Sequence, residues 1–475
     1  ATNHCRGRRI MSAIKITATV YDYSKFDEIE IVEGINYKDV VRDFISSYNY
    51  TYEGKIHRLC RTFNGENFIG GSVGVVRNRI YRYAEKEYDI TLQIKSRFDK
   101  DSKPYFLETM LLDTFEDEYI KENDLRINDD NFFDFLLVYL FKNAVTEASK
   151  KGVYRKYCRF EGNNSCLKGS IDIARHIRLN MGMQNGRIAY SYRENTIDNP
   201  LNRLIYAAHK RLKERFSNNS VMTALLDSSE ITSYLNILHS SMDLYSTNVK
   251  TILPQNLQPI AHPYYTEYEK LRQVCLKVFH DEYLTLFDPD QDSEADTILL
   301  YIPTLWENYL KNQFARYDLG EVKSQDKHKY LCELSDSHEV PDPSKYGRLT
   351  SKPDFVFKKD KKPFMILDAK FKPSWGECMK SPPNYKDFDD NDFNKCLRDM
   401  VIFETDRTGV IFPAHKDIET IFKQCCIIGK KYFYMHAVKV PESSDDTTYE
   451  EWHSTFTENL KKVCDKIRES IKNEA

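Results

Sequence analysis

Two short hydrophobic runs in the C-terminal third of the chain predict a β-hairpin. Residues 355–357 form the first run, residues 364–367 form the second, and the charged residues 358–362 lie between them. Buried strands exclude charge and turns accept it, so this pattern indicates two strands joined by a tight turn. Each strand also carries an acid at one end, Asp354 before the first run and Asp368 after the second.

Short alternating stretches dominate the first hundred residues and predict a β-rich domain over residues 11–106. Its clearest predicted strands lie at 29–32, 80–83 and 88–94. Residues 68–74 supply turn-forming glycines, and residues 37–48 predict a helix. No pattern in this domain indicates catalysis. We expect Met11 to be the native start, and we leave residues 1–10 out of the fold.

The middle of the chain, residues 107–290, is predicted to be largely helical. Apolar residues spaced three and four apart predict a helix that ends at Gly152. This stripe comprises Phe132, Phe135, Leu136, Tyr139, Leu140 and Ala144. A second helix is predicted to begin at Pro200, because a capping side chain at Asn199 precedes a proline in the first turn.

The last region, residues 291–475, is predicted to be a mixed sheet flanked by helices. Strands are expected at 410–412 and within 420–440, and helices at 392–403 and 449–471. The helix at 392–403 has predicted core positions Phe393, Cys396, Leu397, Met400 and Val401. Taken together, the three regions favour a multidomain protein of the α+β or α/β class.

Composition and charge narrow the possible partners and compartment. A formal net charge of −3 gives no global attraction to nucleic acid, so any DNA contact must use a local basic face. No apolar run approaches the roughly 20 residues that a membrane span needs, and we identify no signal peptide. The eleven cysteines form no CxxC pair, which argues against a zinc ribbon or disulfide framework. We expect Cys425 and Cys426 to be core thiols and the protein to be cytoplasmic.

The acids of the hairpin and a nearby lysine form a candidate catalytic set. Asp368 and Lys370 are two residues apart, so a strand points both to one face and turns Ala369 toward the packing layer. With Asp354 they supply two carboxylates and one ammonium. Such a set can hold a hard divalent cation and position a water, which suits metal-assisted phosphodiester cleavage. The competing interpretation is an exposed hairpin with solvated charges.

A basic segment in the middle region is a candidate DNA contact. Arg175, His176 and Arg178 lie on one short element and have the chemistry to grip phosphates. An equally good interpretation is a packing segment with a solvated basic edge. The sequence leaves these two interpretations open.

The hairpin resembles the PD-(D/E)xK nuclease signature, with Pro353-Asp354 and Asp368-Ala369-Lys370 as its two halves. The resemblance implies an endodeoxyribonuclease that uses one or two Mg²⁺ ions, which Mn²⁺ replaces in some nucleases. It implies that Asp354, Asp368 and the Ala369 carbonyl hold the metal. Lys370 would then orient the attacking water or offset the developing negative charge.

The same resemblance implies two further site residues on helices. An upstream helix supplies a Glu to the metal in this superfamily, and Glu307 fits because Pro303 predicts a helix start there. An ordinary Glu at the edge of a packed face is the alternative. On the helix after the hairpin, Lys395 stands near the position where related nucleases often carry a Gln, which makes it a candidate auxiliary residue.

Several motifs in order resemble the McrC family, the nuclease subunit of McrBC-type modification-dependent restriction systems. The resemblance covers roughly residues 105–440 and rests on Lys150–Tyr157, Leu167–Asn180, Glu194–Ile205 and the set Glu307, Asp354, Asp368 and Lys370. It implies a restriction endonuclease that cuts double-stranded DNA when coupled to a hexameric, McrB-like AAA+ GTPase or ATPase. Nuclease domains would pair for double-strand cleavage.

The sequence supports the need for such a partner, because it contains no G-x-x-x-x-G-K-[ST] loop to cradle a nucleotide triphosphate. Two alternatives stay open. One is a stand-alone PD-(D/E)xK nuclease of another defence or repair system. The other is a non-catalytic DNA-binding or assembly subunit, although such subunits usually lose one of the acids or the lysine.

Overall fold

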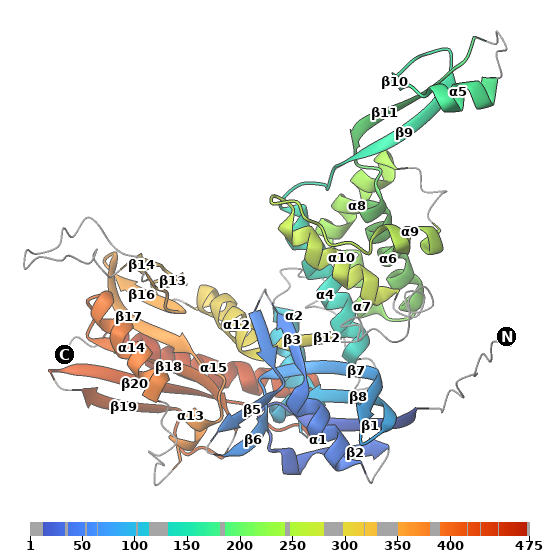
Figure 1. Ribbon diagram of the computed structural model, residues 1–475. Helices are drawn as coiled ribbons and strands as arrows, with labels where there is room; N and C mark the ends of the chain where they lie inside the picture. The colour runs from blue at the N-terminus through green and yellow to red at the C-terminus, as the bar shows by residue number, and fades with distance from the viewer. Residues whose placement is uncertain are drawn as a thin grey trace, which may run out of the picture. The chain divides into compact units, whose positions relative to one another are not determined.

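The computed structural model describes a large part of the chain. The described residues are 13–33, 37–52, 55–63, 65–100, 103–113, 132–180, 186–242, 248–279, 298–317, 319–329, 350–380, 390–415, 417–427, 429–444 and 446–472. They contain both helices and mixed sheets, as the predicted fold class requires (Figure 1).

The described residues form two compact units, and the second is inserted into the sequence of the first. The first unit contains residues 13–113 and 298–472, and the second contains residues 132–279. The sequence predicted three regions, with boundaries near 106 and 290. The structure packs the first and third of these into one unit, because a strand that follows the insertion joins the N-terminal sheet. A further division of the first unit into two domains stays a prediction.

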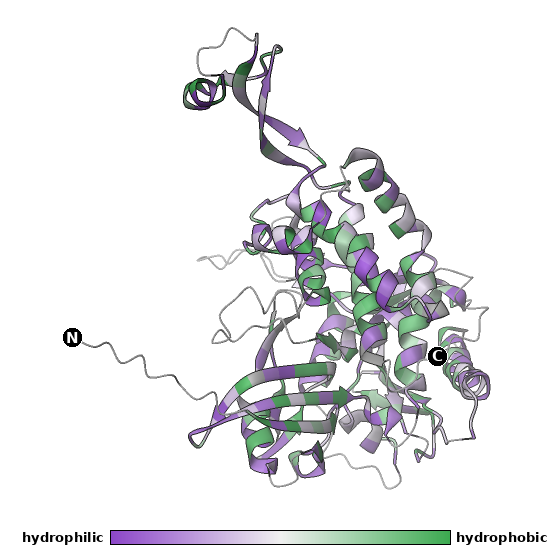
Figure 2. Cartoon of the chain, turned by 90° about the vertical axis from the view of Figure 1, so that its right-hand side faces the viewer, coloured by the Kyte–Doolittle hydropathy of each residue, from purple (hydrophilic) through white to green (hydrophobic). Residues whose placement is uncertain are grey.

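The N-terminal sheet of the first unit has the strand order β12-β7-β8-β1-β2. Its strands are β1 (Ile14–Tyr21), β2 (Glu30–Glu33), β7 (Ser72–Tyr83), β8 (Lys86–Lys95) and β12 (Ile298–Tyr301). Every second residue of β8 from Tyr88 is buried, and Figure 2 shows hydrophobic and hydrophilic segments alternating along these strands. Helix α1 (Lys38–Ser47) packs on the sheet through Val40, Val41, Phe44 and Ile45. The predicted helix and strands are confirmed.

Short elements complete this part of the first unit. They are β3 (Asn49–Tyr52) with β4 (Lys55–Arg58), β5 (Cys60–Phe63) with β6 (Glu66–Ile69), and the 3₁₀ turns η1 (Phe26–Glu28) and η2 (Arg97–Asp99). Strand β12 pairs with β7 where Gly74 has a φ of +139°. A Cβ at Gly74 would collide with the Ile298 carbonyl, so only glycine allows the two strands to meet there.

The second sheet of the first unit is mixed, with the order β13-β16-β17-β18-β20-β19. Its strands are β13 (Glu321–Ser324), β16 (Phe355–Lys359), β17 (Lys362–Ala369), β18 (Arg407–Ala414), β19 (Phe422–Ile427) and β20 (Lys431–Lys439). Strands β16 and β17 form the predicted hairpin, and Asp360 and Lys361 turn the chain at positive φ. Strands β17, β18 and β20 run parallel. A small ladder of β14 (His328–Lys329) and β15 (Thr350–Ser351) lies outside this sheet.

Helices flank both faces of the second sheet, as predicted. Helix α14 (Asp390–Ile402) and the short α13 (Ser374–Glu377) pack on Val410 and Phe412 of β18. On the other face, Trp306 of α12 (Ile302–Arg316) donates to the Ile411 carbonyl, and α15 (Tyr449–Lys472) packs on β20. Aromatic contacts join α2 (Tyr105–Asp113) to α12 and α15.

Two predicted core assignments in this region are wrong. Val401 is 63% exposed, because the sheet-facing positions of α14 are taken instead by buried Asp392, Cys396 and Asp399. Cys425 and Cys426 are exposed free thiols. They lie on β19, a strand at the edge of the sheet, which has a neighbouring strand on one side only.

The second unit contains a group of packed helices. They are α4 (Phe132–Ser149), α6 (Pro200–Arg215), α7 (Ser220–Leu226), α8 (Ser229–Ser241), α9 (Val249–Gln255) and α10 (Thr266–Val278). Helix α10 packs against α4 and α6. Asn199 caps α6 by accepting from the Asn202 amide, and Gly152 follows α4 with a φ of +76°, so both predicted helix ends are confirmed.

The second unit also contains a β-arm, which the sequence did not predict. The arm consists of β9 (Lys156–Asn164), β10 (Ser170–Ile171), α5 (Ile173–Asn180) and β11 (Ile188–Thr196). No residue of β9 is buried, so this strand lacks the run of alternating core positions that predicts a half-buried strand. Several large apolar side chains of the arm are exposed: Tyr157, Leu167, Ile171, Ile173, Ile177 and Leu179.

Among the described residues, no helix combines the length and apolar character that crossing a membrane would require.

One arginine joins the N-terminal sheet to the second sheet. Arg97 donates from its backbone and guanidinium to both carboxylate oxygens of Asp22, each at 2.5 Å, and Asp22 is fully buried. Its Nη2 donates to the Phe371 carbonyl at 2.7 Å, and the guanidinium lies over the Phe371 ring. The residue after Lys370 is therefore held by the N-terminal part of the unit.

Replacing Arg97 by alanine should lower the free energy of unfolding by about 3–5 kcal/mol, because the buried Asp22 carboxylate loses its cation. Urea denaturation measures this loss, and adding Asp22→Asn should recover part of it. Arg77→Ala is the control, because its pair with Asp89 is more exposed and should contribute less than about 1 kcal/mol. Equal losses in the two single variants would contradict the prediction.

Candidate active site

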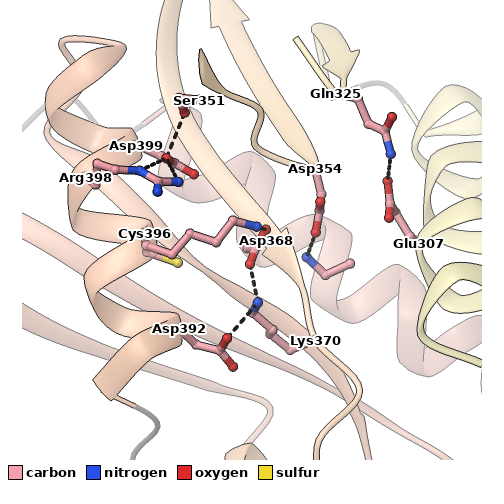
Figure 3. Close-up of polar contacts among 12 residues, drawn as sticks. Glu307, Gln325, Ser351, Asp354, Asp368, Lys370, Asp392, Cys396, Arg398 and Asp399 are labelled. Atoms are coloured by element: carbon pink, nitrogen blue, oxygen red, sulfur yellow. Dashed lines mark hydrogen bonds and ion pairs between the residues drawn. The ribbon is translucent and has the colours of Figure 1, made fainter. Parts of the chain in front are cut away.

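The β16–β17 hairpin brings the two predicted acids together. In its register Phe355 lies opposite Leu367, so Asp354 at the start of β16 faces the end of β17. The Asp354 Oδ2 accepts a hydrogen bond from the Ala369 amide at 2.8 Å (Figure 3). Asp354, Asp368 and Lys370 therefore gather at one end of the hairpin, as predicted from the sequence.

Asp368 is a buried carboxylate with two ammonium partners. It is 2% exposed, and its oxygens lie 2.5 Å from the Lys370 Nζ and 2.6 Å from the Lys395 Nζ. Burial alone would raise the pKa of Asp368, but the two ammonium charges outweigh it and lower the pKa to about 2. Lys395, predicted as an auxiliary residue, thus contacts the predicted metal ligand directly.

The pKa of Asp354 shifts in the opposite direction, upward. Burial raises its pKa, and the neighbouring charge of Asp368 raises it further, to about 8. Two carboxylates this close repel each other when both are ionised, so one of them retains a proton. A divalent cation would relieve that repulsion, and both groups offer the hard oxygen donors that Mg²⁺ prefers. The donor set of Asp354 and Asp368 therefore fits the predicted metal.

Glu307 is half-buried on α12 and hydrogen-bonded to a neighbouring amide. The Gln325 Nε2 donates to its Oε1 at 2.5 Å (Figure 3). Gln325 also donates from its backbone to the Asp354 carbonyl at 2.9 Å, so Gln325 contacts both Glu307 and Asp354. In the part of the chain that the structure describes, no three His, Cys, Asp or Glu side chains converge into a complete metal-binding group. The role of Glu307 as third ligand stays a prediction.

Helix α14 contributes an acid that the sequence analysis did not assign to the site. Asp392 is 8% exposed, and its Oδ1 lies 3.0 Å from the Lys370 Nζ. Burial lowers the pKa of Lys370, but the charges of Asp368 and Asp392 outweigh it and raise the pKa. The sequence did contain an indication of this: Asp392 and Lys395 are three residues apart on a predicted helix, so their side chains lie on one face.

The three predicted DNA contacts lie on the arm of the second unit, in different environments. Arg175 pairs with Glu161 at 3.2 Å. The His176 Nδ1 accepts from Asn180 at 2.8 Å and from the Ala189 amide at 3.3 Å, so His176 holds α5 against β11. Arg178 is exposed. Of the three, His176 has a clear structural task and Arg178 is open to a ligand.

The raised pKa of Asp354 predicts a pH-dependent gain in stability for Asp354→Asn in the absence of metal. Between about pH 4 and pH 8 the folded state keeps a proton that the unfolded chain releases, so the wild type loses stability as pH rises. The variant lacks this loss. Its stability relative to the wild type should therefore increase by up to about 1.4 kcal/mol per pH unit between pH 5 and pH 8. Urea denaturation in EDTA measures it, and parallel curves would contradict it.

No curated protein matches the chain. Two solved structures are similar to it at 14% identity: a half-complex of Thermococcus gammatolerans McrB AAA+ hexamers with bound McrC, and the T. gammatolerans McrBC complex by cryo-EM. The first has a TM-score of 0.41 and covers 94% of this chain and 100% of that chain. The second has a TM-score of 0.30 and covers 63% and 87%.

A family model supplies the assignment. The model described as McrBC 5-methylcytosine restriction system component matches residues 70–393, which is more than half of the chain. The matched segment includes Glu307, Asp354, Asp368 and Lys370. The chain therefore belongs to the McrBC family of restriction system components.

Proposed function

We propose that this chain is the nuclease subunit of a McrBC-type restriction system, a Mg²⁺-dependent endonuclease that cuts double-stranded DNA. The observation that carries the proposal is the meeting of Asp354, Asp368 and Lys370 at the end of a buried hairpin. Family membership makes the same reaction the expected one. The mixed sheet with helices on both faces is consistent with a PD-(D/E)xK fold.

Each residue of the site has a distinct task in this reaction. Asp354 and Asp368 would hold the metal, with Glu307 and the Ala369 carbonyl completing its shell. When bound, Mg²⁺ (or Mn²⁺ in its place) acidifies water and offsets charge on the attacked phosphate. The carboxylates around Lys370 keep it protonated, so it serves as a fixed positive charge beside the phosphate. Lys395, on α14, supplies a second ammonium next to Asp368.

The proposed reaction needs a second polypeptide and a second copy of the site. The sequence has no nucleotide-binding loop of the P-loop type, so NTP hydrolysis would come from an McrB-like AAA+ hexamer. One composite site cuts one strand, and a double-strand break requires two nuclease domains to meet. We place the reaction in the cytoplasm, where the exposed thiols of Cys425 and Cys426 stay reduced.

Asp368→Ala and Lys370→Ala should each lower DNA cleavage by about 10²–10³-fold, because the first removes a proposed metal ligand and the second removes a positive charge beside the reacting phosphate. Lys395→Ala should cost less, about tenfold, since it contacts Asp368 as a supporting partner. Cleavage of methylated and unmodified plasmid with Mg²⁺ measures this, with and without the AAA+ partner plus GTP or ATP. Glu321→Ala, on the exposed pair with Lys323 in β13, is the control.

Cleavage with and without the AAA+ partner and nucleotide distinguishes the competing functions. Cutting that requires partner and nucleotide and is lost in Asp368→Ala supports the proposal. Cutting by the chain alone with Mg²⁺ would indicate a stand-alone nuclease. A wild type that never cuts, or an Asp368→Ala variant that cuts at the wild-type rate, would overturn the assignment and favour a non-catalytic assembly subunit.

We further propose that the basic side of α5 contacts DNA phosphates through Arg175 and Arg178, with His176 holding the helix. Arg178→Ala should weaken binding across all sequences and lower the slope of log affinity against log salt by about 1. Fluorescence anisotropy over a salt series measures the slope. Lys210→Ala, an exposed lysine of the same unit, is the control. An unchanged slope in Arg178→Ala would remove this contact from the proposal.

A further inference from the structure

Asp392 contacts the lysine of the candidate site from the opposite side to Asp368. The Lys370 Nζ lies 2.5 Å from the Asp368 Oδ2 and 3.0 Å from the Asp392 Oδ1 (Figure 3). Asp368 belongs to β17, and Asp392 belongs to the first turn of α14. The ammonium is therefore held between a strand and a helix.

The other oxygen of Asp392 is occupied as well. Its Oδ2 accepts from the Lys372 Nζ at 3.0 Å and from the Trp375 indole at 3.3 Å. Trp375 is fully buried, so the indole is a fixed donor. With one oxygen anchored by these two donors, the carboxylate presents its remaining oxygen to Lys370. Both oxygens of Asp392 thus contact nitrogen donors.

A lysine held only by Asp368 would lack a defined position. Its four-carbon stem has many rotamers, and its ammonium would settle wherever the Asp368 charge attracts it. The second carboxylate removes that freedom, because the ammonium must satisfy both contacts at once. Displacing a catalytic group by about 1 Å can cost about 10²-fold in rate, so such a restraint matters for a reaction at Lys370.

We propose that Asp392 is a positioning residue for Lys370, itself held by Lys372 and Trp375. The inference rests on the proposed nuclease function and adds a residue to it. Asp392 sets where the positive charge stands while Asp354 and Asp368 remain available to the metal. It follows that loss of Asp392 affects the rate of the chemical step and leaves metal and DNA affinity unchanged.

Helix α14 provides a matched control in Asp399. This residue is also buried, at 2% exposure, and lies seven residues later on the same side of the helix. Its Oδ1 accepts from Ser351 at 2.8 Å and from Arg398, and not from Lys370. Asp399→Asn therefore disturbs a buried carboxylate of the same helix without touching the lysine.

The experiment compares the wild type, Asp368→Ala, Asp392→Ala, Asp392→Glu, Asp399→Asn and Lys372→Ala in the full chain with its AAA+ partner. Single-turnover cleavage at saturating Mg²⁺ gives the rate, and calorimetry with Mg²⁺ alone gives metal binding. We expect Asp392→Ala to slow the chemical step by about 10²-fold. Asp392→Glu should restore part of the rate. Lys372→Ala, at a residue outside the core, should cause an intermediate loss.

The outcomes separate this inference from the proposed function. If the wild type neither binds Mg²⁺ nor cuts, the nuclease proposal fails. If the wild type cuts, Asp368→Ala does not, and Asp392→Ala cuts as fast as the wild type, only the positioning role fails. Loss of Mg²⁺ binding in Asp392→Ala would make Asp392 a metal ligand instead. If Asp392→Ala does not fold, Asp392→Glu and Lys372→Ala decide, and rates equal to that of Asp399→Asn would overturn the inference.

Discussion

A carboxylate buried at the end of a sheet needs positive charge beside it, and this requirement shapes the site around Asp368. An isolated buried anion is too costly to retain, so folding brings two ammonium groups to it, Lys370 directly after β17 and Lys395 on α14. Lys370 in turn contacts a second acid, Asp392. The polar cluster is thus a series of contacts between opposite charges, from Asp368 through Lys370 to Asp392, and Asp392 also accepts from the indole of Trp375.

Helices that pack on the second sheet explain why the polar cluster around Asp368 is buried. Alternate residues of β18 point to opposite faces, so Val410 and Phe412 pack under α13 and α14, and the Ile411 carbonyl between them accepts from Trp306 of α12. Helix α14 consequently lies over the face that carries Asp368, and its polar positions face the end of the hairpin. Arg97 then holds the chain directly after Lys370 from the N-terminal part of the unit. The acids are therefore positioned by packing on several sides.

Local patterns predicted the parts of the structure that depend on local physics. The hairpin, its acids, the capped start at Asn199 and the long terminal helix follow from periodicity and turn chemistry, which neighbouring residues determine. Asp392 was missed because its role depends on a strand more than twenty residues earlier in the chain. Cys425 and Cys426 were misassigned because an apolar run does not reveal that its strand lies at an edge. The arm was not predicted because β9 has no buried residue, so its sequence lacks the alternating core positions that indicate a strand.

Strand β12 has a consequence for how the protein is made. The N-terminal sheet is complete only when residues 298–301 pair with β7, yet the ribosome produces β7 long before them. At about 5–20 residues per second, synthesis of the intervening chain takes on the order of tens of seconds. Throughout that time β7 presents an unpaired edge beside Gly74, a template on which another nascent chain can pair. Rapid folding of the inserted helices does not shorten this interval, so the N-terminal sheet gains its last strand only after residues 298–301 have been synthesised.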